Sequence, residues 1–520
     1  MFHKTLLSTL VLVTSATSLA NSPTPIDPLA DLPFYNQTES GYSLDFDGKN
    51  YRSLETTVNG ETIKFRAFEK IVYVKNPVEA DYQTINFYVP EAYFNDQEIN
   101  GFNANSAPIF LPNAVGGYMP AKAATYDKKG LGASDKPNAI QVALSKGYVV
   151  ASVGARGRTL EKEGVYTGKA PAVIVDLKAA VRYLHANDSK MAGDANKIIS
   201  NGTSAGGAVS ALLGASGDSA DYAEYLKQLG AAEASDSIFA VSAYCPIANL
   251  ENADMAYEWE FNGVNQYSRM DMSRLTAQGF NDRSQPKPRI EGELSAEEIK
   301  LSAQQKAMFP AYLNSLNLKD KDGKPLTLDE QGNGSFKEYL RSIIQESAQT
   351  AYRQLAQNSE EWTNFRNQYS WLSFEKDSIA HLDWDKYIHS EKRMKSPLAF
   401  DALDLSTGEN NLFGTDKINN QHFTDYAQQH STATNASLAD KNIVKLMNPM
   451  NYIKNKGSAE HWRIRAGTSD RDTSHAISAI LAIKLTMAGK NVDYATPWGV
   501  PHSGDYDLDE LFNWADSIVK

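Results

Sequence analysis

The stretch that decides the fold is NGTSAGGAVSALLGAS, residues 201–216. It follows the short apolar run KIIS at 197–200 and continues as a helix-forming segment. Within it, Gly202, Ser204 and Gly206 form a Gly-x-Ser-x-Gly pattern, which is typical of a nucleophilic serine held on a sharp turn between a strand and a helix. Glycine on both sides lets such a turn close without Cβ clashes. The alternative is an ordinary helix start capped by serine or threonine, but the strand before the pattern favours the nucleophile.

A parallel α/β sheet is predicted on both sides of this stretch. Apolar, β-branched segments alternate with helical patterns from about 107 to 245, and such alternation indicates parallel strands joined by helices. The near-continuous apolar character of these strands suits a sheet covered on both faces. The alternation returns with a strand at 461–467, a helix at 474–488 and a strand at 491–496.

Between these two parts the pattern changes. Residues 255–455 contain long amphipathic helical segments and turn-rich connectors. We therefore predict an α/β domain over residues 21–254 and 456–520, with a large, mainly helical lid inserted at 255–455.

The first 20 residues have the pattern of a secretory signal. Lys4 precedes a mainly apolar run at 6–13, and small residues lead to a predicted cut near Ala20. The run is too short to span a bilayer. We expect an exported protein, periplasmic or extracellular, without a membrane anchor; an uncleaved buried helix is the alternative.

Charge and cysteine content narrow the class further. The 520 residues include 51 basic and 63 acidic side chains, for a net charge of −12. Such an acidic chain argues against nucleic-acid binding. Cys245 is the single cysteine, so no internal disulfide forms. We expect it to be a small buried residue.

A serine nucleophile needs a base, and in this fold the histidine follows the acid in chain order. His475 and His502 both follow the strand at 461–467. His475 falls in the predicted helix, where a satisfied surface histidine is expected. His502 lies in PWGVPHSGDYD, a loop after the last strand, and such loops carry catalytic residues. We predict His502 as the base.

The triad acid is expected in the loop after the strand at 461–467. That loop contains both Asp470 and Asp472. Asp472 can instead serve as a helix N-cap or first-turn acid, so chemistry favours Asp470 without excluding Asp472. Asp254, after the strand at 238–244, is a third and weaker candidate.

The oxyanion of an acyl-transfer reaction needs two backbone donors. One is expected to be the N–H of Ala205, directly after the nucleophile. The other is expected from the loop PNAVGGYMP, where Gly117, or its neighbour Gly116, allows the backbone to approach a carbonyl; an ordinary turn is the alternative. Arg156 and Arg158 in GARGR suit an anion site, but structural pairing is favoured.

Metal ligation is not expected. The acids of ENADMAYEWE, residues 251–260, have a spacing that suits metal ligands, yet no histidine lies near them. We predict neither a metal nor a cofactor.

Several motifs together resemble the bacterial tannase family (tannin acylhydrolase, subtype B) of the α/β-hydrolase superfamily. The similarity runs from about residue 65 to 515, lid included. The motifs are PNAVGGYMP, GTSAGG, YCPIANLENADMAYEW, MKSPLAFDALDLSTGENNLFG, DRDTS and VPHSGDYD.

The resemblance implies a triad of Ser204, Asp470 and His502. It also implies that Lys395, Glu409 and Asp472 hold a galloyl ring. Without this resemblance, Lys395 and Glu409 would be interpreted as solvated charges on the lid. Carboxylates are acceptor-only groups that match the three phenolic hydroxyls of such a ring, and charged acceptors strengthen the hydrogen bonds.

The expected function is that of a serine esterase acting on a small phenolic ester, the galloyl ester of tannins and simple gallates, with protocatechuoyl esters as further substrates. Other possibilities are a feruloyl-type or general carboxylesterase, a prolyl-oligopeptidase-like serine peptidase, and a non-catalytic binding protein on the same fold.

Overall fold

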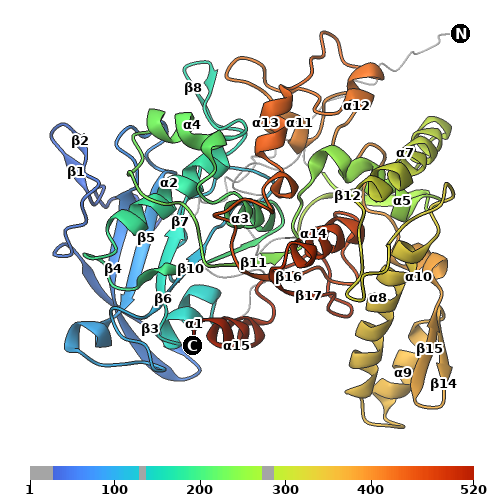
Figure 1. The fold of residues 1–520 in the computed structure, drawn as a ribbon, viewed down its shortest axis with the longest axis horizontal. Helices are drawn as coiled ribbons and strands as arrows, with labels where there is room; N and C mark the ends of the chain where they lie inside the picture. The colour runs from blue at the N-terminus through green and yellow to red at the C-terminus, as the bar shows by residue number, and fades with distance from the viewer. Residues whose placement is uncertain (1–26, 128–135, 272–285) are drawn as a thin grey trace, which may run out of the picture. The chain divides into compact units, whose positions relative to one another are not determined.

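In the part of the chain that the structure describes, nine strands form one sheet, and strands from both the N-terminal and the C-terminal part take part in it (Figure 1). The structure is a computed structural model that describes residues 27–127, 136–271 and 286–520, so the predicted signal segment lies outside the described residues. Met1–Pro33 and Phe34–Lys520 are separate units, and the sheet belongs to the second. The strands, in chain order, are β3 (Arg52–Val58), β4 (Glu61–Val72), β5 (Thr84–Pro90), β6 (Pro108–Pro112), β7 (Val149–Val153), β10 (Asp194–Thr203), β11 (Ala240–Tyr244), β16 (His461–Arg465) and β17 (Asn491–Ala495).

The spatial order of the strands is β17-β16-β11-β10-β6-β7-β5-β4-β3. The strands from β17 to β7 are parallel, whereas β5, β4 and β3 continue the sheet in antiparallel fashion. β7 and β11 are buried along their whole length, which explains their continuous apolar sequence. The predicted parallel α/β sheet is therefore confirmed. The edge strand β3 was not predicted, because its residues are mostly exposed and polar.

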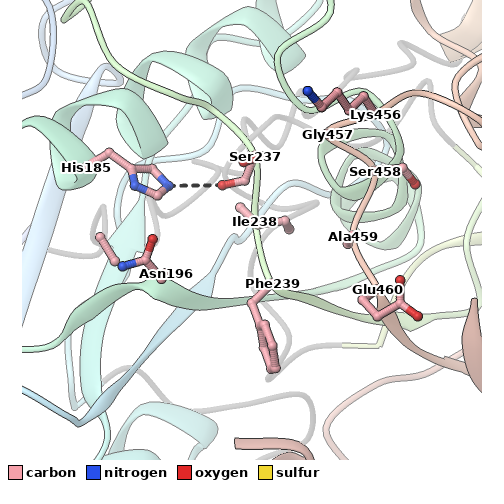
Figure 2. A pocket seen from close by; sticks show the side chains of 11 residues that line it. His185, Asn196, Ser237, Ile238, Phe239, Lys456, Gly457, Ser458, Ala459 and Glu460 are labelled. Carbon is pink, nitrogen blue, oxygen red and sulfur yellow. Dashed lines mark hydrogen bonds between the residues drawn. The ribbon is translucent and has the colours of Figure 1, made fainter.

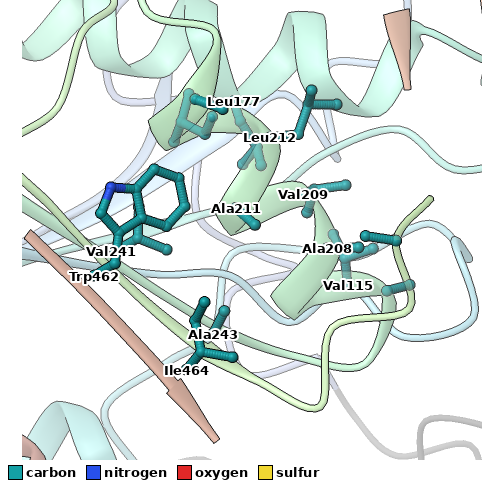
Figure 3. Packing of buried hydrophobic residues seen from close by; sticks show 14 of the residues in the cluster. Val115, Leu177, Ala208, Val209, Ala211, Leu212, Val241, Ala243, Trp462 and Ile464 are labelled. Atoms are coloured by element: carbon teal, nitrogen blue, oxygen red, sulfur yellow. The ribbon is translucent and has the colours of Figure 1, made fainter. Parts of the chain in front are cut away.

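Helices packed on the sheet supply a further part of the core. The main ones are α1 (Ala139–Ser145), α2 (Ala172–Ala186), α3 (Ala205–Ala215), α4 (Ala223–Gln228), α14 (His475–Met487) and α15 (Leu508–Val519). Figure 3 shows Val209 and Leu212 on α3 and, on the neighbouring strands, Val241 of β11 and Trp462 of β16. All four side chains are buried, and each contributes about 2 kcal/mol or more through burial. This packing holds the start of α3 rigidly at the end of β10.

The chain leaves the sheet after β11 and rejoins it at β16. The described residues between them form helices and two small antiparallel hairpins, β12–β13 and β14–β15. The limits of the predicted lid, 255 and 455, stay a prediction. The elements are α5 (Ala253–Phe261), β12 (Gln266–Met270), β13 (Arg289–Glu293), α7 (Ala296–Ser315), α8 (Ser335–Arg353), α9 (Glu360–Gln368), β14 (Leu372–Glu375), β15 (Ser378–Leu382), α10 (Trp384–Glu391), α11 (Gly408–Leu412), α12 (Asp425–Gln429) and α13 (Lys441–Leu446).

Candidate active site

Ser204 lies on a strained turn between β10 and α3. Its backbone angles are φ 63° and ψ −124°, a conformation that costs a side-chain-bearing residue on the order of 1–3 kcal/mol. A Cβ at Gly202 would lie 2.3 Å from Gly206 O, and one at Gly206 would lie 2.6 Å from Val115 O. The two glycines are therefore needed for the turn to close, and the turn has the geometry of a nucleophile elbow.

The strand ends explain why distant segments meet beside Ser204. Thr203, Tyr244, Arg465 and Ala495 pair in register across β10, β11, β16 and β17. Because parallel strands end at the same edge of a sheet, the segments that follow these four residues share one edge. The expected nucleophile, acid and base all lie in these segments.

The loop after β16 and the loop after β17 hold each other in place. The N–H of Ser469 donates to Val500 O at 3.1 Å, and the N–H of Thr468 donates to Pro497 O at 2.9 Å. The Gly499 N–H donates to Thr468 Oγ1 at 2.8 Å. These bonds bring the two aspartates toward His502.

Asp470 is the aspartate that contacts His502 most closely. Its Oδ2 lies 2.9 Å from His502 Nδ1, whereas Asp472 Oδ2 lies 3.8 Å from the same nitrogen. Asp470 is 3 % exposed, and its second oxygen accepts the Asp472 N–H at 2.9 Å. The side chain is therefore fixed by two bonds, as an acid that orients an imidazole requires.

The electrostatics of this pair favour a charged or strongly basic imidazole. Burial opposes protonation of His502, but the carboxylates of Asp470 and Asp472 outweigh it and raise its pKa well above the ordinary value. Burial favours the neutral acid at Asp470, but His502 outweighs burial and holds the pKa of that carboxyl below its usual range. The pair therefore provides an ionised acid beside a base with high proton affinity.

His502 Nε2, on the other side of the ring, faces the sulfur of Cys245 at 4.0 Å. Cys245 is buried, as predicted, and its thiol donates to Ser503 O at 3.3 Å. Of the residues described, Cys245, Asp470 and His502 form the one group with ligand atoms spaced for a metal, and two of them are the predicted acid and base. Ser204 Oγ makes no hydrogen bond with any residue that the structure describes. The hydrogen bond between a nucleophile and its base is often long before substrate binds.

Three backbone N–H groups are free to receive a substrate oxygen. Among the described residues, the N–H groups of Ala205, Gly116 and Gly117 donate to no protein acceptor. Gly117 has φ 55°, and the carbonyl of Gly116 accepts the Met119 N–H at 2.9 Å. Because N–H and C=O point in opposite directions in one peptide, this bond turns the Gly117 N–H away from the turn interior.

Lys395 and Asp472 are in direct contact, although 77 residues separate them. Lys395 Nζ donates to Asp472 O at 2.7 Å and lies 3.6 Å from Asp472 Oδ1. It also lies 4.4 Å from the centre of the Phe400 ring. Both charged side chains stay partly exposed, so they can meet a ligand beside His502.

Glu409 stands in the first turn of α11. Its carboxylate receives no hydrogen bond from another described residue. Burial raises its pKa, while the charges of Lys395 and Arg158 lower it and that of Asp472 raises it. The structure thus brings Glu409 into electrostatic reach of the other two predicted ring-binding residues and leaves its oxygens available as acceptors.

Tyr257, in α5, links the segments that carry Lys395 and Asp472, a contact that the sequence did not predict. Its hydroxyl accepts the N–H groups of Met394 and Lys395, both at 3.1 Å, and donates to Arg471 O at 3.0 Å. The acids of ENADMAYEWE have a spacing that suits metal ligands, but its tyrosine is part of no comparable pattern. Nothing in a lone tyrosine within a helix signals such a role.

His475 is not a surface residue, and that prediction is wrong. It is 3 % exposed, with Nδ1 2.6 Å from Glu260 Oε1 and Nε2 3.0 Å from Gly467 O. The first turn of α14 packs against α5. The sequence of α14 alone does not show which neighbouring element covers that turn. Its role is structural, because it braces the loop that carries Asp470.

This ion pair predicts a specific loss of stability at high pH. Burial disfavours the imidazolium, yet Glu260 outweighs burial and raises the pKa of His475 to about 9. The contribution of this ion pair to the free energy of unfolding is therefore fully present below the unfolded pKa of about 6.5 and is lost as pH rises through 9. Between these values we expect the free energy of unfolding to fall by up to about 3 kcal/mol. Urea unfolding of wild type and His475→Gln measures this, with His389→Gln, an exposed histidine, as control. Equal pH dependence in all three proteins would contradict it.

Asp254, the third candidate for the triad acid, faces elsewhere. Its carboxylate accepts the N–H groups of Phe400 and Asp401, both at 2.9 Å, and burial raises its pKa to about 7. The other acids of ENADMAYEWE also have separate protein partners. These are Asn448 for Glu251, Arg393 for Glu258, and Ser474 and His475 for Glu260.

A cavity of about 270 Å³ lies away from this edge of the sheet (Figure 2). It is lined by the beginning of β10 and by the segments that precede β11 and β16, and His185 Nε2 lies 3.0 Å from Ser237 O beside it. These are the amino ends of the strands, whereas the predicted catalytic residues follow the carboxyl ends. None of the predicted site residues lines this cavity.

The sheet order, the elbow at its centre and the helical insertion define the class: this is an α/β-hydrolase. A family model described as BD-FAE matches residues 124–286, and a search among curated proteins gives no match. The structure of Fusobacterium nucleatum tannase is 55 % identical, with 92 % of this chain and 100 % of that chain covered and a TM-score of 0.86.

Two further solved structures agree. Tannase from Lactobacillus plantarum is 46 % identical over 92 % of this chain and 100 % of that chain, with a TM-score of 0.85. A tannin acyl hydrolase in complex with ethyl gallate is 46 % identical over 92 % and 99 %, with a TM-score of 0.83. The chain therefore belongs to the tannase family and is a carboxylic ester hydrolase of the tannase type.

Proposed function

We propose that this enzyme hydrolyses galloyl esters through Ser204, His502 and Asp470. The observation that supports the proposal is that one loop, the loop after β16, contacts both the predicted base and a lysine predicted to bind the ring. Asp470 lies 2.9 Å from the imidazole of His502, and two residues later Asp472 contacts Lys395. A galloyl ring bound by Asp472 would have its ester carbonyl close to His502, the residue that Asp470 orients.

Acylation begins when His502 Nε2 takes the Ser204 proton and Oγ attacks the ester carbonyl. The oxyanion accepts hydrogen bonds from the Ala205 and Gly117 N–H groups, with Gly116 as the neighbouring donor. The C–O bond to the alcohol then breaks, and the imidazolium returns the proton to the leaving alkoxide. Asp470 stabilises that imidazolium, in line with the raised pKa of His502.

Deacylation repeats the same steps with water. His502 takes a proton from water, the resulting hydroxide attacks the galloyl carbonyl, and Ser204 leaves with the proton returned by the imidazolium. Gallate is released and the serine hydroxyl is restored. No metal or cofactor takes part in this proposal.

Lys395, Glu409 and Asp472 select the acyl group. Glu409 and Asp472 accept hydrogen bonds from phenolic hydroxyls, and Lys395 donates to a third oxygen. A site built for these hydroxyls penalises a ring that lacks them, because its own polar groups then lose their partners. Relatives of this chain have been solved with ethyl gallate and with 3,4-dihydroxybenzoate, which supports a galloyl and, second, a protocatechuoyl preference.

The selective role of Glu409 predicts a selective loss. We expect Glu409→Gln to reduce kcat/KM for methyl gallate by about 10- to 100-fold, the effect of one hydrogen bond to a charged acceptor. Methyl benzoate, which lacks ring hydroxyls, should be hydrolysed at its wild-type rate. Initial rates on a panel of hydroxybenzoate esters measure both.

Asp416→Asn is the matched control, because Asp416 is an exposed acid shortly after α11. It should leave the whole panel unchanged. Equal losses on methyl gallate and methyl benzoate in Glu409→Gln would count against ring recognition. Wild-type enzyme that hydrolyses both esters equally would favour a general carboxylesterase, and one that cleaves aminoacyl amides with no ester preference would favour a peptidase.

We also propose that the enzyme is exported after cleavage near Ala20. The basic and apolar pattern of residues 1–20 supports this. Every helix within the described ranges is too short or too polar to span a bilayer. The N-terminal sequence of the exported protein tests the proposal, and retention of Met1 would contradict it.

A further inference from the structure

Arg158 is a buried cation that contacts two separate parts of the proposed site. It is 8 % exposed. Its Nε donates to Gly117 O at 2.7 Å, and its backbone N–H donates to Tyr118 O at 2.9 Å. Its Nη1 donates to Asn411 Oδ1 at 3.0 Å, in the short helix that carries Glu409.

On one side, Arg158 holds the turn that offers the oxyanion donors. Gly117 and Tyr118 have φ values of 55° and 54°, a conformation that is costly for tyrosine. The Tyr118 hydroxyl is anchored on Ile247 O at 3.0 Å. With Gly117 O and Tyr118 O both bonded to Arg158, the peptides on the C-terminal side of the donor are fixed in orientation.

On the other side, Arg158 holds the start of α11. A Cβ at Gly408 would lie 3.1 to 3.2 Å from three guanidinium atoms, so the helix backbone rests directly on the guanidinium. Asn411, two residues after Glu409, receives Nη1. Glu409 itself acts on Arg158 through its charge, partly offsetting the burial that lowers the pKa of the guanidinium.

The neighbouring arginine has a different environment. Arg156 forms a buried ion pair with Asp176, with Nη2 2.8 Å from Oδ1, so structural pairing is confirmed for this residue. Arg158, by contrast, has no carboxylate oxygen within 4.0 Å among the described residues. A buried charge without an ionic partner is costly, and its hydrogen bonds to the two site segments are what compensates for it.

We propose that Arg158 is a positioning residue that couples ring recognition to the oxyanion turn. The inference rests on the proposed function, since it assumes the roles of Gly117 and Glu409. A galloyl ring bound to Glu409 fixes the position of α11. The guanidinium of Arg158, which is bonded to both segments, then fixes the turn 116–119 relative to α11. Ring recognition then contributes to kcat as well as to KM.

Lys169 provides a matched control, because it holds the same helix without touching the turn. Its Nζ donates to Asn411 O at 2.8 Å and to Asn419 O at 2.8 Å. Lys169→Met should loosen α11 alone. We expect a several-fold higher KM for methyl gallate and turnover of methyl benzoate within about twofold of wild type.

Arg158→Lys keeps the charge but cannot donate to Gly117 and Asn411 in the same planar geometry. We expect kcat to fall by about 10- to 100-fold on methyl gallate and by a smaller factor on methyl benzoate, which lacks the hydroxyls that Glu409 is proposed to bind, because a small misplacement of a catalytic group has effects of this size. Arg158→Ala should show the same loss, and guanidinium chloride at low millimolar concentration should restore part of kcat. Thermal melts report whether each variant is folded.

The outcomes separate the inference from the proposed function. Equal behaviour of Arg158→Lys and Lys169→Met, with only KM for methyl gallate affected, would show that Arg158 merely anchors α11 and would overturn the coupling. Folded Arg158→Lys with wild-type kcat would overturn it as well. If wild-type enzyme does not distinguish methyl gallate from methyl benzoate, the proposed function fails, whereas the kcat loss in Arg158→Lys still tests the link to the turn.

Discussion

Replacing Ser204 by alanine is expected to reduce kcat for every ester by about 10⁵-fold or more. The variant lacks the oxygen that forms the acyl-enzyme, and no other group described at this edge has the elbow geometry. Binding of gallate should persist, because Glu409, Asp472 and Lys395 are untouched. Rates on methyl gallate and calorimetric titration with gallate measure the two expectations.

The sequence itself offers a control for this experiment. Gly-Thr-Ser recurs at 467–469, directly before Asp470, but Ser469 stands in a loop that folds back on Val500 rather than at the start of a helix. Ser469→Ala should keep activity within about fivefold of wild type. A fluorophosphonate probe should label wild type and Ser469→Ala but not Ser204→Ala. Labelling that survives in Ser204→Ala would exclude Ser204 as the nucleophile.

Asp470→Asn is expected to reduce kcat by about 10⁴-fold on all esters alike. Asparagine fits the same space, but its amide cannot stabilise the imidazolium and allows the wrong tautomer of His502. The 2.9 Å contact with Nδ1 and the near-complete burial of Asp470 make water a poor substitute. Steady-state kinetics on methyl gallate and methyl benzoate should show the same fractional loss.

Asp472→Asn is the paired variant and should behave differently. It should reduce kcat/KM on methyl gallate more than on methyl benzoate, since the carboxylate is proposed to accept from the ring. Asp472 also raises the pKa of His502, and losing that charge disfavours the imidazolium. The acid limb of the kcat/KM profile should therefore move to lower pH. If Asp472→Asn loses all activity and Asp470→Asn keeps it, the two roles are reversed.

Local sequence was sufficient for much of the fold. The elbow at Ser204, the buried strands β7 and β11, and the helix after Ser204 are each encoded by residues that are neighbours in the chain. Their signals are periodicity, glycine placement and β-branched composition, which act over a few residues. The edge strand β3 was missed for the same reason: its exposed polar residues carry no such signal.

The site was harder to predict, because its parts come from segments far apart in the chain. Lys395 and Glu409 look like solvated charges in isolation, and only a family resemblance singled them out. Tyr257 and Arg158 had no detectable signal for their contacts. Tyr257 bonds to backbone groups of distant segments, and Arg158 bonds to Gly117 O and to the side chain of Asn411, 253 residues away. Backbone groups leave no trace in side-chain patterns, and residues so far apart in the chain share no local pattern.

The sequence by itself determined that a serine sits between a strand and a helix, that a histidine follows the last strand, and that two aspartates stand in the loop after the strand at 461–467. It left open which aspartate contacts the histidine. Only the tertiary structure decided that, because the answer depends on how the loops after β16 and β17 pair. Asp470 and Asp472 are two residues apart in one turn, and a turn, unlike a helix or a strand, has no fixed period that sends a given side chain to a given face.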